Sequence, residues 1–72
     1  MDYGTMMENL MDRFGEWCND NGLTYTESQV NRFAIRSEER IEEIMTGGCD
    51  MDEAYEMYLE ELNDEIRYIM RE

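Results

Sequence analysis

The segment that decides the fold is TESQVNRFAIRSEERIEEIMTGGCDMDE, residues 26–53, because it holds one complete helix and the start of the next. Thr26 and Gln29 have the spacing of a capping box, in which each side chain accepts a backbone amide of the other residue. The residues that follow recur at the helical period and share one face of the predicted helix: Val30, Phe33, Ala34, Ser37, Ile41, Ile44 and Met45. We expect a helix over residues 27–46. A break at Ser37 is the alternative, because a serine can also cap a shorter second segment.

Two glycines separate this helix from the next one. Gly47-Gly48 is a stop signal, because glycine adopts left-handed backbone conformations without the steric penalty of a side chain. Asp50 stands at an N-cap position, with Glu53 at the third helical position. Apolar residues at helical spacing follow: Met51, Tyr55, Tyr58 or Leu59, Leu62, Ile66 and Ile69. This pattern predicts a third helix over residues 50–71.

The N-terminal part of the chain carries similar signals. Thr5-Met-Met-Glu8 has the form of a capping box, and Gly22 suits the left-handed position after a helix end. A helix over residues 5–21 is therefore expected. The face predicted for it consists of Tyr3, Met7, Leu10, Phe14 and Trp17. Gly15 inside this helix costs about 1 kcal/mol relative to alanine, which close packing against a neighbour would explain.

Three amphipathic helices with short connections predict a single all-α domain over residues 1–72, an up-down-up three-helix bundle. The alternative is a helical hairpin that completes its core by dimerising. A core of this size contributes only about 3–5 kcal/mol of stability. Cys18 and Cys49 fall at opposite ends of such a bundle, so no intramolecular disulfide is expected.

Charge is the most unusual feature of the composition. Nineteen Asp and Glu oppose six Arg, with neither Lys nor His, and the net charge is −13. Such a chain repels nucleic acids and anionic membranes and attracts basic proteins, so we expect neither direct nucleic-acid binding nor membrane binding. There is no leader segment and no long apolar run. A cytoplasmic protein with reduced thiols is expected.

The side chains needed for catalysis are missing from the sequence. There is no histidine to act as a base near neutral pH, and neither serine belongs to a nucleophile motif. Asp50-Met-Asp52 with Glu61 imitates the outline of a calcium loop. However, Ala54 and Tyr55 stand where that loop needs an oxygen ligand and a glycine. The sequence therefore predicts a chain that is not an enzyme and has no metal or cofactor.

Acidic residues are concentrated in the first and third predicted helices. Residues 50–65 contain eight acids and no base, or one charge per roughly 3 Å of helix, against one per about 1.7 Å of duplex DNA. A second group recurs every four residues in the first helix. We predict these acids to bind a partner: Glu8, Asp12, Glu16, Asp20, Asp52, Glu53, Glu56, Glu60, Glu61, Asp64 and Glu65. The alternative interpretation is a solvated surface that only keeps the protein soluble.

Arginines form a stripe of their own on the second predicted helix. Arg32, Arg36 and Arg40 recur every four residues, so they share one side of that helix. We expect this stripe to pair with acids of the first or third helix. Pairing of this kind leaves a predominantly negative surface elsewhere.

In size, charge and helicity the chain resembles small acidic proteins that phages and mobile elements use against host machinery. That group includes nucleic-acid mimics and inhibitors of CRISPR or restriction complexes. The resemblance implies an inhibitor that occludes the basic surface of a nucleic-acid-binding host protein or defence complex, and it carries over no functional residues. The alternative is a non-catalytic module that forms a homodimer or larger assembly through its methionine-rich apolar stripe. Such assembly would depend on Leu62 and Ile66.

Overall fold

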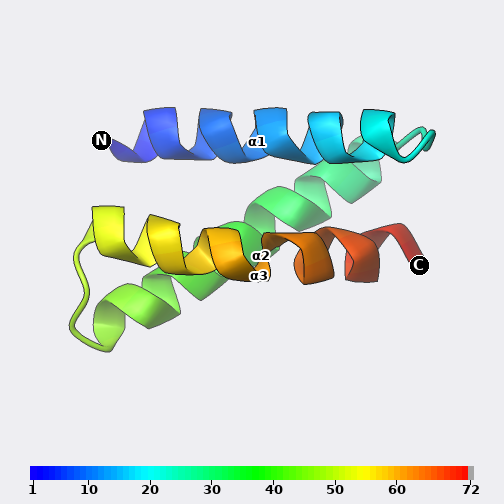
Figure 1. Ribbon diagram of the computed structural model, residues 1–72. Coiled ribbons are helices and arrows are strands. Elements are labelled where there is room, and N and C mark those ends of the chain that lie inside the picture. Colours follow the sequence, from blue (N-terminus) through cyan, green and yellow to red (C-terminus); the bar gives the residue numbers. More distant parts are fainter. Residues whose placement is uncertain (72) are drawn as a thin grey trace.

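Three helices make up the computed structural model, which describes residues 1–71: α1 (Tyr3–Asp20), α2 (Glu27–Thr46) and α3 (Met51–Arg71). Figure 1 shows α1 and α3 running in the same direction, while α2 returns in the opposite sense and crosses them at an angle. Each helix packs against both others, and the α2–α3 contact is the most extensive. The predicted up-down-up bundle is confirmed, and a single chain completes its own core without the dimerising hairpin.

The start of α1 differs from the prediction. The backbone amide of Thr5 donates to Oδ1 of Asp2 at 2.7 Å, so Asp2 is the N-cap and Thr5 is the third helical residue. The predicted capping box of Thr5 and Glu8 is therefore wrong. Aspartate caps at least as well as threonine, and capping at Asp2 rather than Thr5 adds three residues, Tyr3 to Thr5, to the helix.

The end of α1 and the start of α2 have the predicted geometry. Gly22 has a left-handed φ of 67°. The amides of Gly22 and Leu23 donate to carbonyls of the last turn at 3.1 and 2.8 Å, which is a Schellman motif. In the capping box of α2, the amide of Gln29 donates to the Thr26 hydroxyl at 3.2 Å, and the Thr26 amide donates to Gln29 Oε1 at 2.9 Å.

The junction of α2 and α3 also follows the sequence signals. Gly48 has a φ of 111° after the end of α2. The amide of Glu53 donates to Oδ1 of Asp50 at 2.8 Å, which caps α3. The helix α2 continues through Ser37 without interruption, so the alternative break at that residue is wrong.

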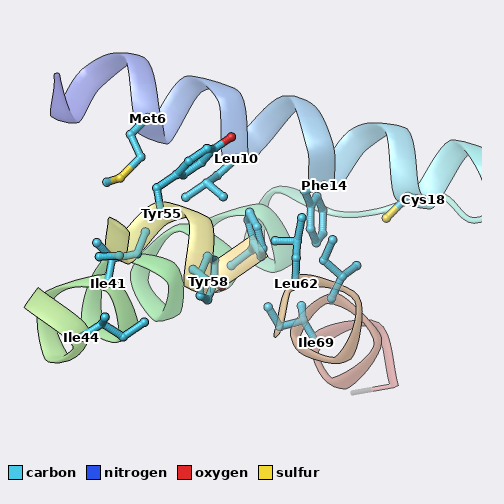
Figure 2. Packing of buried hydrophobic residues seen from close by; sticks show 13 residues of the cluster. Met6, Leu10, Phe14, Cys18, Ile41, Ile44, Tyr55, Tyr58, Leu62 and Ile69 are labelled. Atoms are coloured by element: carbon cyan, nitrogen blue, oxygen red, sulfur yellow. The ribbon is translucent and has the colours of Figure 1, made fainter. Parts of the chain in front are cut away.

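The buried face of α1 is rotated from the predicted one. Its buried residues are Met6, Leu10, Phe14 and Cys18, and Figure 2 shows them directed toward the other helices. Tyr3 is 44% exposed, and Trp17 only packs against the edge of the core. Residues spaced by four turn through about 400° of helix, so their stripe slants around α1.

The faces of α2 and α3 agree with the prediction more closely. Phe33, Ile41 and Ile44 of α2 are buried, as are Tyr55, Tyr58, Leu62, Ile66 and Ile69 of α3. Tyr58 is the buried member of the Tyr58–Leu59 pair, and Ala54 joins the core without having been predicted. Tyr58 and Ser37 hydrogen-bond through their hydroxyls at 2.7 Å, across the α2–α3 contact. Burial raises the pKa of Tyr58 to about 12.

Candidate protein-binding surface

The acids of α1 form one exposed stripe. Glu8, Asp12, Glu16 and Asp20 are all exposed, and their four-residue spacing places them on the side of α1 away from its buried residues. Asp12 and Glu16 border a shallow depression beside Tyr55, so the stripe adjoins α3 at this point. Asn9 and Arg13 line the same depression, which puts one positive charge at the edge of the stripe.

The acids of α3 divide into two groups. Asp52, Glu53, Glu56, Glu60 and Asp64 are exposed and lie away from the core. Glu61 and Glu65 are half-buried and turn toward α2, where arginines neutralise them. The structure therefore gathers the predicted partner-binding acids into an α1 stripe and an α3 stripe, and it places Glu61 and Glu65 outside both.

Arginines of α2 bind these two inward-turned carboxylates. Arg40 donates from Nε and a terminal nitrogen to the two oxygens of Glu61, both at 2.9 Å. Arg36 pairs with Glu65, and its guanidinium lies 4.6 Å from the centre of the Tyr68 ring. Hydrogen bonding from Arg40 lowers the pKa of Glu61. The expected pairing of the arginine stripe with α3 is confirmed for these two arginines.

The remaining exposed acids still form dense lines of charge. Along α1 the acids are four residues apart, or about 6 Å, and along α3 the five exposed acids have a mean spacing of about 4.5 Å. One strand of duplex DNA carries a charge about every 3.4 Å along its axis. Both mean spacings lie within a factor of two of the DNA value.

Ion pairs within the stripes do little to neutralise them. Arg67 lies 3.8 Å from Asp64, and the N-terminal amine lies 3.6 Å from Asp52. The carboxylates of both pairs are well exposed to solvent, and such pairs contribute at most about 1 kcal/mol. A basic partner could therefore displace them readily.

The outline of a calcium loop belongs to a helix in the structure. Asp52 and Glu61 both lie within α3, where the backbone carbonyls bond within the helix rather than turning toward an ion. Within residues 1–71, no group of three or more His, Cys, Asp or Glu side chains is arranged to hold a metal ion. Both cysteines are free thiols, and burial raises the pKa of Cys18.

None of the described helices is long and apolar enough to cross a membrane. Comparison with known proteins found no matching family model, no matching curated protein and no matching solved structure.

Proposed function

We propose that this chain is a non-catalytic inhibitor that covers the basic surface of a nucleic-acid-binding protein. The observation that carries the proposal is the pair of exposed acidic stripes on adjacent helices, in a chain that has no lysine to intersperse among them. The proposed targets are CRISPR or restriction complexes, or other host proteins that phages and mobile elements must block.

The mechanism is steric occlusion, with carboxylates in the places of phosphates. A protein that binds nucleic acid neutralises phosphates with Arg and Lys, and the same side chains can pair with the carboxylates of α1 and α3. Regular helices hold these carboxylates at a set spacing, which reduces the entropy lost on binding. The net charge of −13 also steers the chain toward a basic surface and raises the association rate.

Intramolecular repulsion supports a functional role for the stripes. Like charges four residues apart destabilise a helix by a few tenths of a kcal/mol per pair, and α1 contains three such successive steps from Glu8 to Asp20. A stripe that served solubility alone could avoid this cost by alternating with lysine. Cations of a partner would relieve the repulsion upon binding.

A matched pair of double variants tests the proposal. Glu56→Gln with Glu60→Gln removes two charges from the α3 stripe, and Glu39→Gln with Glu43→Gln removes two charges at the same spacing on α2. Tagged wild-type and variant proteins would be used to capture binding proteins from a nuclease-treated bacterial lysate. Captured proteins would then be identified, and their affinity for each variant measured.

We expect the α3 variant to bind a captured basic protein about 2- to 30-fold more weakly, because two exposed ion pairs contribute about 0.4–2 kcal/mol together. The α2 variant should bind as the wild type does. Equal binding by both variants, or capture of proteins without affinity for nucleic acid, would count against occlusion by the stripes.

The two residues on which the self-associating alternative was expected to depend are buried in the bundle. Leu62 is 6% exposed and Ile66 is fully buried, so both belong to the core of a single chain. Leu62→Asp would therefore unfold the monomer rather than separate two subunits. We therefore favour the acidic stripes as the binding surface.

A further inference from the structure

An apolar depression lies at the end of the bundle where the N-terminus of α1, the second half of α2 and the start of α3 meet. Its volume is about 250 Å³, and its apolar lining consists of Tyr3, Met6, Ile41, Met45 and Met51. Figure 2 shows Met6 directed from α1 toward the other two helices at this end. In another protein, a cavity of about 150 Å³ binds benzene, so the depression is large enough for an aromatic side chain.

Two carboxylates stand at the rim of this depression. Glu38 and Glu42 are one helical turn apart on α2, and both are exposed. Among the described residues, neither carboxylate has an ion-pair partner. The neighbouring Glu43 pairs with Arg40 at 2.9 Å. The negative charge at the rim is therefore not compensated by an ion pair, in contrast to that of Glu43, Glu61 and Glu65.

Tyr3 joins the apolar lining to the charged rim. Its pKa is raised, first by desolvation and then by a hydrogen bond to Glu38 and by the charges of Glu38 and Glu42. Tyr3 as a whole is nevertheless 44% exposed to solvent. The methionines of the lining have flexible side chains that adapt to the shape of a ligand.

We propose that this depression receives a large apolar side chain of the partner, flanked by Arg or Lys that pair with Glu38 and Glu42. The inference rests on the proposed function, because it identifies a second part of the basic partner that this chain contacts, in addition to the surface with which the partner binds phosphates. Charge complementarity selects the occupant: an apolar side chain fills the depression, and a basic neighbour pairs with Glu38 and Glu42. An acidic or neutral segment would leave those carboxylates without an ion-pair partner.

Such an anchor supplies what the acidic stripes lack. Exposed charge pairs steer association and set orientation, but each contributes little affinity. Buried aromatic or aliphatic side chains in pockets provide most of the binding energy at protein interfaces. The depression would therefore contribute specificity and a slow dissociation rate, while the α1 and α3 stripes contribute rapid association.

Capped tripeptides test the anchor without a known partner. We would titrate Arg-Phe-Arg into protein whose methionine methyl groups are isotopically labelled and follow them by NMR. The signals of Met6, Met45 and Met51 should shift, while that of Met57, which is exposed on α3, should not. Arg-Ala-Arg and Glu-Phe-Glu should leave the three signals in place, because each lacks one of the two features.

Variants then distinguish the contribution of the Glu38 and Glu42 charges to peptide binding from that of the apolar depression. Glu38→Gln with Glu42→Gln should weaken Arg-Phe-Arg binding about 2- to 30-fold, whereas the matched pair Glu39→Gln with Glu43→Gln should not. Tyr3→Ala should also weaken binding, because it removes one wall of the depression.

Three results would overturn the anchor: equal shifts with Glu-Phe-Glu, shifts spread over all methionines, or no shift at all. Any of these would leave the proposed function standing, because that function is tested separately by the Glu56 and Glu60 substitutions. Conversely, loss of the stripe effect with intact Arg-Phe-Arg binding would reject occlusion by mimicry and retain the depression as a site for basic, apolar segments.

Discussion

The hydroxyl pair of Ser37 and Tyr58 offers a sharp test of how the bundle is held together. Both side chains are buried, with exposures of 0% and 1%, and their oxygens lie 2.7 Å apart. No buried side-chain N or O atom of the described residues lacks a hydrogen-bond partner. Ser37→Ala would therefore create an unsatisfied hydroxyl on Tyr58 in the middle of the α2–α3 contact.

Leaving a buried polar group unsatisfied costs about 1–3 kcal/mol, a large part of the roughly 3–5 kcal/mol that a domain of this size has available. Tyr58→Phe should cost less, about 0.5–1.5 kcal/mol, because the Ser37 hydroxyl can turn to the carbonyl one turn earlier in α2. The double variant replaces both hydroxyls by apolar groups. It should therefore be much more stable than the sum of the single effects predicts.

Urea unfolding followed by far-ultraviolet circular dichroism gives the free energy of unfolding for all four proteins. We expect a coupling energy of at least about 1 kcal/mol, with Ser37→Ala the least stable of the four. Additivity of the two substitutions within about 0.5 kcal/mol would refute the reasoning. It would mean that the two hydroxyls do not depend on each other in solution.

Three further predictions concern pH, a glycine and salt. The pKa of Tyr58 is about 12 in the folded protein instead of the ordinary 10.0, so the contribution of the protonated hydroxyl to stability should be fully present below pH 10 and decline as the pH rises toward 12. Tyr58→Phe should reduce this decline, and unfolding midpoints that move equally with pH in both proteins would contradict the prediction. A Cβ at Gly15 would lie 3.3 Å from the hydroxyl of Tyr25, a half-exposed side chain that can move, so Gly15→Ala should stabilise the protein by less than the full helix-propensity gain of about 1 kcal/mol and by more when Tyr25→Phe is also present. If Gly15→Ala destabilises the protein both with and without Tyr25→Phe, the Tyr25 side chain does not move aside. Sodium chloride should raise the melting temperature, because the acids of a chain with a net charge of −13 repel one another and 0.1 M salt screens this repulsion beyond about 10 Å. A melting temperature that falls with salt would show that the arginine–glutamate pairs outweigh the repulsion.

Local signals in the sequence predicted α2 and α3 closely. The Thr26 and Gln29 capping box, the Gly47-Gly48 stop and the Asp50 cap each act within one helical turn, so no distant contact is needed to interpret them. At the start of α1, two capping residues three positions apart compete. Asp2 takes the amide of Thr5 and thereby excludes Thr5 from capping.

Tertiary packing decided the features that the sequence did not predict. Two apolar stripes are available on α1, and the one containing Met6 and Cys18 is buried against the other two helices. The separation of Glu61 and Glu65 from the other acids of α3 also depends on which side of α3 meets α2. A partial signal was present, because these two acids lie on the same side of Leu62, about 100° and 60° from it on the helical wheel. The depression at Tyr3 and Glu38 draws on all three helices, and no local pattern reveals it.

The most direct test of the central claim is an exclusion experiment with a captured basic partner. The partner would be bound to a labelled DNA or RNA duplex, and the chain would be added while the bound duplex is followed by fluorescence anisotropy. Occlusion predicts that the wild-type chain releases the duplex, and that the variant with Glu56→Gln and Glu60→Gln requires about 2- to 30-fold more protein to do so. A complex in which the partner holds the chain and the duplex together, with the anisotropy undiminished, would contradict the account.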